Sequence, residues 1–262
     1  MLDARRAAFL HEMGIGDLWL PREAAAQDTL PVAPAQLDAE ESFHAAPAAK
    51  RPVPPALVPA PVRVQPSPPD GDRAGIIAGL DWEPLAQTVS QCTACGLCKS
   101  RTQTVFGVGD RQAPWMLVGE APGAEEDARG EPFVGQAGRL LDNMLAALRL
   151  RRGDGVYIAN VLKCRPPSNR NPEPHEVAAC EPYLKRQIAL IQPRLILVLG
   201  RFAAQSLLGT DASIASLRGK VHRYAGVPLI VTYHPAYLLR TLDDKAKAWE
   251  DLLFARKTMR EL

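Results

Sequence analysis

Four short runs rich in Val, Ile and Leu constrain the fold of this chain more than any other feature of its sequence. These runs are residues 115–119, 156–162, 195–199 and 229–233. The helical patterns between and after them cover about 137–150, 174–191, 201–208 and 244–260. Apolar strands that alternate with helices predict a parallel sheet covered on both faces. We therefore expect a three-layer α/β/α fold around a mainly parallel, four-stranded sheet.

The chain of 262 residues divides by composition into three parts. Residues 1–22 have a short amphipathic pattern, and residues 23–75 contain eleven prolines between Pro31 and Pro69. A Pro- and Ala-rich segment of this kind buries too little apolar surface to offset the entropy of ordering it, so we expect a disordered linker. The pattern of a folded domain begins at about residue 76 and continues to residue 262.

Residues 1–22 have two interpretations. Their apolar side chains, among them Phe9, Leu10 and Trp19, either pack onto the main domain or form a docking peptide for the groove of a partner. The segment resembles the N-terminal peptide of the clamp-loader psi subunit. That resemblance implies a replication or clamp-loader protein as the partner.

The charge of the chain is unevenly distributed. Residues 1–91 carry 7 Lys and Arg against 12 Asp and Glu, whereas residues 92–262 carry 24 against 17. A basic domain behind an acidic leader suggests a polyanion such as DNA as ligand, although a solvated surface gives the same numbers. The N-terminus has no continuous apolar segment of a signal peptide, and no apolar run approaches the roughly 20 residues of a membrane span. We expect a cytoplasmic monomer without membrane association, whose cysteines are not disulfide-bonded.

The five cysteines suggest a metal centre. They are Cys92, Cys95, Cys98, Cys164 and Cys180. Thiols two residues apart close easily on one metal, but the second C-x2-C knuckle of a zinc ribbon is missing from the sequence. Four thiolates drawn from one close pair and two distant positions suit an iron–sulfur cluster. The alternative is a set of unrelated buried cysteines, and the spacing leaves open whether Cys95 or Cys98 is the second ligand.

Polar side chains gather where three of the predicted strands end. The loops that carry them are residues 119–127, 160–167 and 233–240. Taken singly, Asn160 is an ordinary turn residue, Phe133 a core residue and His234 a structural histidine. The carboxyl ends of parallel strands lie along one edge of a sheet, however, where ligands bind in open α/β folds. We therefore expect these loops to form one site.

Three motifs in these loops, in this order, resemble those of the family 4 uracil-DNA glycosylases. The first is Gly119-Glu120-Ala121-Pro122-Gly123, followed by Glu126-Asp127 and by Pro132-Phe133-Val134-Gly135. The second and third are Asn160-Val161-Leu162-Lys163-Cys164-Arg165-Pro166-Pro167 and His234-Pro235-Ala236-Tyr237-Leu238-Leu239. The resemblance covers residues 92–254. It implies that a [4Fe–4S] cluster is held by Cys92, Cys95, Cys164 and Cys180, with Cys98 extra to the family pattern.

The resemblance implies an enzyme that flips uracil out of DNA and hydrolyses its N-glycosidic bond, leaving an abasic site for base excision repair. Phe133 would stack on the base, and the Asn160 amide would select uracil over cytosine. His234, with backbone N–H groups near Glu120 and Ala121, would stabilise the negative charge on the departing base. Glu120 would position the attacking water. Glu126 would either support that water or cap the following helix.

Other residues of the same loops are expected to contact DNA. Leu238 and Leu239 suit an apolar wedge that enters the base stack, although they equally suit a helix start that packs inward. Lys163, Arg165 and Arg240 would then contact phosphates.

Two other functions compete with excision. One is a non-catalytic DNA- or replisome-associated module on the same fold, in which the cluster is only a scaffold. The other is a variant that becomes covalently attached to uracil-containing DNA. That variant carries an extra basic loop containing a histidine after the second motif, whereas residues 165–176 here are rich in Pro and Asn and contain only His175.

Overall fold

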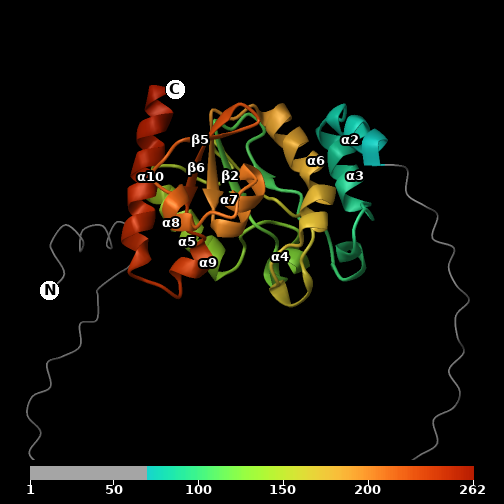
Figure 1. Ribbon diagram of the computed structural model, residues 1–262, viewed down its shortest axis with the longest axis horizontal. Coiled ribbons are helices and arrows are strands. Elements are labelled where there is room, and N and C mark those ends of the chain that lie inside the picture. Colours follow the sequence, from blue (N-terminus) through green and yellow to red (C-terminus); the bar gives the residue numbers. More distant parts are fainter. Residues whose placement is uncertain (1–69) are drawn as a thin grey trace, which may run out of the picture. The chain divides into compact units, whose positions relative to one another are not determined.

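A six-stranded sheet in the order β1-β3-β2-β4-β6-β5 forms the centre of the computed structural model, which describes residues 70–262 (Figure 1). The strands are β1 (Val108–Gly109), β2 (Trp115–Gly119), β3 (Val156–Asn160), β4 (Leu195–Leu199), β5 (His222–Tyr224) and β6 (Val227–Thr232). The four predicted strands are confirmed as β2, β3, β4 and β6, and they pair in parallel.

The prediction of only four strands was too low, because two short strands pair antiparallel at the edges of the sheet. β1 has two residues, and β5 has the sequence His-Arg-Tyr. Neither strand contains the apolar run on which the sequence argument depended. The sheet is nevertheless mainly parallel, as expected.

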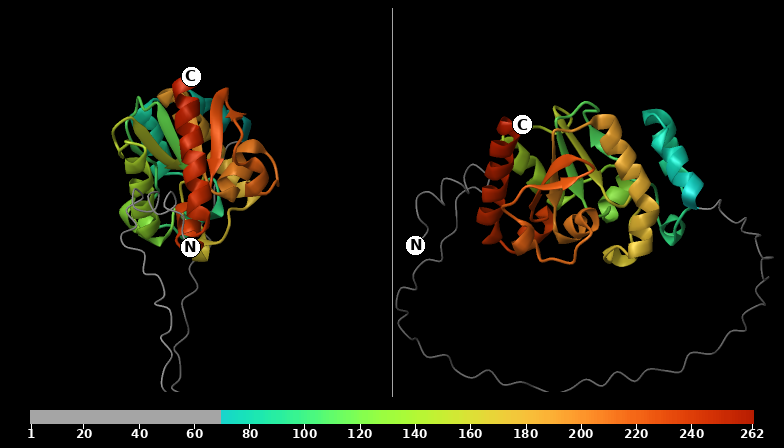
Figure 2. Two further views of the ribbon diagram at one scale, coloured as in Figure 1. Left: turned by 90° about the vertical axis from the view of Figure 1, so that its left-hand side faces the viewer. Right: turned by 45° about the horizontal axis from the view of Figure 1, so that its top comes forward.

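Helices cover both faces of the sheet, which confirms the three layers (Figure 2). The α-helices are α2 (Asp70–Ala78), α3 (Trp82–Ser90), α4 (Ala124–Arg129), α5 (Gln136–Ala147), α6 (Pro174–Ile191), α7 (Arg201–Leu208), α8 (Ile214–Leu217), α9 (Pro235–Leu238) and α10 (Asp244–Glu261). Two short 3-10 helices are η1 (Gly96–Lys99) and η2 (Pro167–Asn169). Within residues 70–262, no helix has both the length and the apolar character of a membrane span.

The folded domain begins earlier than the composition suggested. Helix α2 starts at Asp70, six residues before the expected boundary at 76, in a segment with few apolar residues. The interpretations of residues 1–22 and of the linker up to residue 69 concern positions outside the described residues.

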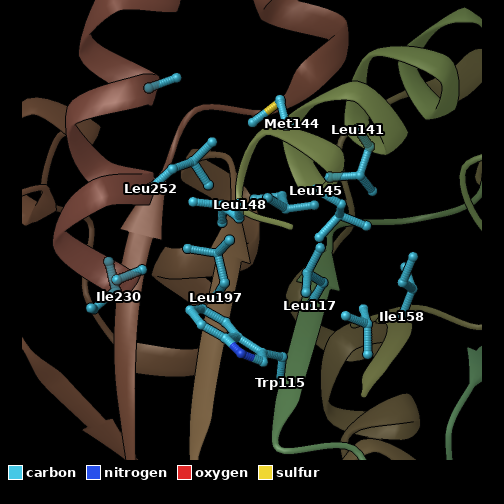
Figure 3. Close-up of a cluster of buried hydrophobic side chains, with 14 of the residues drawn as sticks. Trp115, Leu117, Leu141, Met144, Leu145, Leu148, Ile158, Leu197, Ile230 and Leu252 are labelled. Carbon is cyan, nitrogen blue, oxygen red and sulfur yellow. The ribbon is translucent and has the colours of Figure 1, made fainter. Parts of the chain in front are cut away.

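Alternating side chains of the central strands build two separate cores. Trp115, Leu117 and Leu197 pack with helices α5 and α10 on one face, where Figure 3 shows them beneath Leu145 and Leu252. The neighbouring strand residues point to the other face and pack with α6 and α7. Each fully buried Leu or Ile contributes about 1.5–3 kcal/mol. Packing on both faces therefore holds the strands in place, and their parallel direction brings their carboxyl ends to one edge.

A third cluster joins the first helices to the sheet. Helices α2 and α3 lie beside α6 (Figure 1) and bury Ile77, Leu85 and Val89 against Tyr183. Cys164 and Cys180 belong to the same cluster. The N-terminal helices are thus part of the wall around the cysteines.

Gly138 makes the tightest packing contact of helix α5. A Cβ atom there would overlap the carbonyl group of Phe133, whereas a Cβ atom at Gly75 in α2 would meet nothing within 4 Å. We expect Gly138→Ala to lower the free energy of unfolding by about 1–3 kcal/mol, the usual cost of overpacking. The control Gly75→Ala should raise it by up to about 1 kcal/mol, because alanine loses less backbone entropy in a helix. Denaturant unfolding measures both, and equal stability of the two variants would contradict the contact.

Candidate functional site

The carboxyl ends of the four parallel strands open into one cleft of about 770 Å³. Seven of the eleven residues predicted for catalysis, base recognition and DNA contact line it: Glu120, Ala121, Glu126, Phe133, Asn160, His234 and Arg240. The three predicted loops therefore lie around one cleft. Their individual roles in catalysis remain predictions.

Asn160 is the most deeply buried polar group of the cleft, with 2% of its surface exposed. It ends strand β3, beside Gly119 at the end of β2. A Cβ atom at Gly119 would collide with Oδ1 of Asn160 and would lie 2.6 Å from Cζ of Phe133, so only glycine fits there. Within the described part of the chain, Oδ1 of Asn160 has no hydrogen-bond partner. An unpaired buried acceptor costs about 1–3 kcal/mol, so this oxygen is suited to a ligand that donates a hydrogen bond.

Phe133 forms an aromatic wall against His234. The two ring centroids lie 5.5 Å apart, with 31° between the planes. The backbone of Phe133 has a φ of 55°, which is uncommon for a residue other than glycine. Arg152 holds this conformation, because its guanidinium donates to the carbonyls of Pro132 and Phe133 at 2.7 and 2.9 Å.

His234 is a neutral hydrogen-bond donor in this environment. Burial lowers the pKa of His234 to about 4; the Glu126 carboxylate opposes this shift and Arg240 adds to it. The residue caps helix α9, and its Nδ1 accepts the backbone N–H of Ala236 at 3.1 Å. In the neutral ring the proton must then be on Nε2. His234 thus presents an N–H group without a positive charge.

Burial shifts the pKa of Glu120 in the direction opposite to that of His234. Burial raises the pKa of Glu120 to about 7, and the nearby Arg201 limits the rise. The carboxyl group therefore changes its protonation state close to neutral pH.

Glu126 and Asp127 have structural partners. The two oxygens of Glu126 each accept one backbone N–H at 3.1 Å, from Gly123 and from Val134. Glu126 therefore caps helix α4 and ties it to the Phe133 loop, as its alternative interpretation proposed. Asp127 is buried and accepts the backbone N–H of Thr102.

The structure corrects two of the predicted DNA contacts. Lys163 has 1% of its surface exposed, and its Nζ donates to the carbonyl of Asn160 and to Oε1 of Gln187. It cannot reach a phosphate, and burial lowers its pKa to about 8 although the thiols of Cys180 and Cys164 oppose the shift.

Leu238 is the second correction, because it is 1% exposed and packs in the core beneath α5 and α10. Its neighbour Leu239 is 42% exposed and can therefore still act as the apolar wedge that was predicted to enter the base stack. Arg240 is exposed beside the cleft. Arg165 donates to the side chain of Asn169 at 2.8 Å, so it also braces its own loop.

Other residues of the site were not anticipated. Gly200 and Arg201 follow strand β4 and line the cleft, and Asn169 and Arg170 line it from the loop after β3. The strand-end rule applied to β4 would have found Gly200 and Arg201. Arg152 gave no such signal, since its distance in sequence from Phe133 conceals the contact.

All five cysteines surround a second, small cavity beside helices α3 and α6. Three of the sulfurs accept an N–H group: Cys92 from Arg73 at 3.7 Å, Cys164 from Arg101 at 3.2 Å and Cys180 from the backbone of Lys163 at 3.3 Å. The side chain of Cys95, which begins helix η1, accepts no capping hydrogen bond, and Cys98 has no such donor either among residues 70–262. Because N–H donors stabilise thiolate sulfur, this pattern suits Cys92, Cys164 and Cys180 as ligands and does not separate Cys95 from Cys98.

The spread of the sulfurs argues against a single metal ion. Four sulfurs at about 2.3 Å from one zinc lie about 3.8 Å apart. In residues 70–262, three metal-ligating atoms lie within 4.8 Å of one another only at Glu173, His175 and Glu176. No three of the thiols are that close together, which suits the larger body of an iron–sulfur cluster.

Comparison with known proteins gives matches over this domain. The profile of the uracil DNA glycosylase superfamily matches residues 106–253. The type-4 uracil-DNA glycosylase of Archaeoglobus fulgidus is 48% identical in an alignment of 163 residues that covers 59% of this chain and 81% of that protein. The type-4 enzyme of Pyrobaculum aerophilum is 47% identical in an alignment of 169 residues that covers 62% of this chain and 86% of that enzyme. The type-5 uracil-DNA glycosylase of Thermus thermophilus is 30% identical in a gapped alignment of 191 residues that covers 59% of this chain and 87% of that protein.

The raised pKa of Glu120 predicts a pH-dependent stability. Between its ordinary value of 4.5 and about 7, the folded chain keeps this proton while the unfolded chain loses it. The stabilisation is therefore complete below pH 4.5 and is lost as the pH rises to 7. We expect wild type to lose stability relative to Glu120→Gln between pH 5 and 7.5, by at most about 1.4 kcal/mol per pH unit. Denaturant unfolding across this range measures the difference.

Glu125→Gln is the matched control, because Glu125 is an exposed carboxylate on the adjacent helix α4. Its stability should run parallel to that of wild type at every pH. A parallel curve for Glu120→Gln as well would show that Glu120 is not held in a desolvated position.

Proposed function

Because the chain belongs to the uracil-DNA glycosylase superfamily, and within it to the type-4 family, we propose that it removes uracil from DNA by hydrolysing the bond between base and deoxyribose. The observation that carries this proposal is the unpaired Oδ1 of Asn160 beside Phe133 and the neutral His234. A uracil ring offers the N–H group that Oδ1 lacks.

Recognition begins when the base leaves the DNA stack, at a cost of a few kcal/mol. In the cleft, Phe133 stacks on the ring. The Asn160 side chain accepts the N3–H of uracil through Oδ1 and donates its amide N–H to the O4 carbonyl. Cytosine has an unprotonated N3 and an amino group at these positions, so both groups of Asn160 would face the wrong partner. This mismatch accounts for selection of uracil.

Bond cleavage moves negative charge onto the base. The C1′–N1 bond breaks, its electron pair stays on uracil, and the sugar acquires the positive charge of an oxocarbenium ion. Nε2–H of His234 donates to uracil O2, where part of the negative charge develops. A neutral donor suits this role, because it stabilises the anion without requiring a low pH.

Water completes the reaction at C1′. The Glu120 carboxylate orients the water, stabilises the cationic sugar and accepts the proton that the water releases. Its pKa of about 7 makes the reactive carboxylate more abundant as the pH rises through neutrality. Glu126 contributes by holding the Phe133 loop, and its supporting contact with the water stays a prediction.

The DNA around the flipped base would lie over the mouth of the cleft. Leu239 would enter the gap in the base stack, and Arg240 and Arg201 would contact phosphates. Arg165 would contact a neighbouring phosphate from the loop after β3. For residues 1–22 we retain the docking interpretation, with a replication or clamp-loader protein as partner. We also place the monomeric enzyme in the cytoplasm, with its DNA substrate.

Excision is the direct test of this proposal. Incubation with a uracil-containing single-stranded oligonucleotide, followed by alkali and a denaturing gel, should reveal cleavage at an abasic site. Asn160→Ala should lower kcat/KM by roughly 10- to 100-fold, since two hydrogen bonds to the base are lost. Asn143→Ala, an exposed change on α5, should match wild type.

The same gel separates the alternative functions. An unchanged oligonucleotide would indicate the non-catalytic module, and a band of reduced mobility would indicate covalent attachment. The structure gives the covalent variant no support, because the exposed His175 is not among the residues that line the cleft.

We propose further that Cys92, Cys95, Cys164 and Cys180 hold a [4Fe–4S] cluster. When bound, the cluster would supply a structural cross-link between the α3–η1 segment, the loop after β3 and helix α6, because hydrolysis of a glycosidic bond needs no electron. The N–H donors to Cys92, Cys164 and Cys180 would stabilise three of the thiolates.

Replacement of single cysteines tests the ligand set. Cys95→Ser should lose most of its iron and its absorbance near 400 nm, whereas Cys98→Ser should retain both. Iron and sulfide per protein, measured after anaerobic purification, provide the readout. Loss of the cluster in Cys98→Ser with retention in Cys95→Ser would reverse the assignment.

A further inference from the structure

Lys163 is a buried cation that the proposed reaction leaves without a role. Its Nζ lies 2.9 Å from the carbonyl oxygen of Asn160 and 2.7 Å from Oε1 of Gln187. Gln187, which is also fully buried, donates its side-chain N–H to the carbonyl of Phe106 at 2.9 Å. The two side chains therefore form one continuous bridge between the backbones of Asn160 and Phe106.

The Lys163–Gln187 bridge lies where the next hydrogen-bonded residue pair between β1 and β3 would be expected. β1 and β3 pair at Gly109 with Tyr157 and at Val108 with Ile158, and there the antiparallel pairing stops. The same register would place Phe106 opposite Asn160. Within residues 70–262, the pairing of β1 with β3 does not extend to the backbone carbonyls of these two residues, and the Lys163–Gln187 bridge supplies a donor to each. The bridge thus takes the place of strand hydrogen bonds at Asn160, the residue proposed to recognise the base.

We propose that Lys163 is a positioning residue that sets the orientation of Asn160 in the uracil site; this inference rests on the proposed function. The carbonyl that Nζ holds is bonded to the Cα that carries the Asn160 side chain, so a backbone shift that moved this carbonyl toward another donor would also displace the side-chain amide from the base. A buried acceptor that loses its partner does rotate or admit water, because staying unpaired is costly. The Nζ group prevents both.

Lys163 is itself fixed from two sides. Its backbone N–H donates to Sγ of Cys180 at 3.3 Å, and its carbonyl accepts the backbone N–H of Val105 at 2.7 Å. One residue thus connects the cysteine cavity with the backbone of Asn160. A defect at the thiols would reach the uracil site through this connection.

Lys163→Met tests the inference, since methionine fills similar space without a donor. We expect the variant to keep the iron content of wild type, to bind free uracil at least tenfold more weakly by calorimetry, and to raise KM and lower kcat on the uracil oligonucleotide. The matched control is Lys245→Met, a lysine that is 7% exposed on α10. It should bind uracil within about twofold of wild type.

A double-mutant cycle separates positioning from general support of the fold. In the Asn160→Ala background, Lys163→Met should change uracil affinity by less than about twofold, because the side chain that Lys163 orients is already gone. Equal effects of Lys163→Met in both backgrounds would overturn the inference, as would uracil binding by Lys163→Met equal to that of wild type.

If Lys163→Met does not fold, a second variant tests the positioning role of Lys163. Gln187→Met keeps the lysine but breaks the bridge, and it should weaken uracil binding at least threefold in the wild-type background and not in Asn160→Ala. An unchanged affinity would overturn the inference. If wild type neither excises nor binds uracil, the proposed function fails and the inference falls with it. If wild type does both and the bridge variants match it, only the role of Lys163 fails.

Discussion

Parallel pairing of four strands that are buried on both faces is the constraint on which this structure depends. Because β3, β2, β4 and β6 run in one direction, their carboxyl ends share an edge, and the loops that follow them meet. A one-residue shift of register would exchange the side chains of the two cores, and close packing opposes such an exchange because the two sets of side chains have different partners. Residues as distant in sequence as Glu120, Asn160 and His234 are brought together by this pairing alone.

The same burial organises the electrostatics of the cleft. Removal from water penalises whichever form of a group is charged. It therefore raises the pKa of Glu120 to about 7 and lowers the pKa of His234 to about 4. One physical cause thus gives the cleft a carboxyl group that titrates near neutrality and an imidazole that stays uncharged. The backbone N–H of Ala236 then selects the tautomer, so a local helix cap determines which nitrogen faces the substrate.

The sequence allowed prediction of features that follow from strand direction and apolar pattern. It gave wrong predictions where the role of a residue depends on whether its side chain is buried. The four parallel strands, the main helices and the cleft residues Glu120, Asn160 and His234 at the ends of β2, β3 and β6 were predictable from strand direction and apolar pattern. The predicted DNA contacts of Lys163 and Leu238 were wrong, because a motif gives the order of residues but does not say which side chains point into the protein and which point to the surface. Lys163 looked like a basic loop residue, yet its amine points into the protein toward Gln187, 24 positions away. The edge strands β1 and β5 were missed because hydrogen bonding, and not an apolar pattern, defines them.

The cysteine cavity shows what the fold adds to a spacing argument. Cys95 and Cys98 both reach the cavity, and the C-x2-C-x2-C pattern fits either. What the fold adds is a set of donors to the other three sulfurs, because Arg73, Arg101 and the backbone of Lys163 approach them from α2, the segment after η1 and the loop after β3. The loop that presents Cys164 also begins at Asn160, so the order of the cysteine cavity and the order of the base-reading residue share one stretch of backbone. A structural centre placed there can influence recognition without taking part in the reaction.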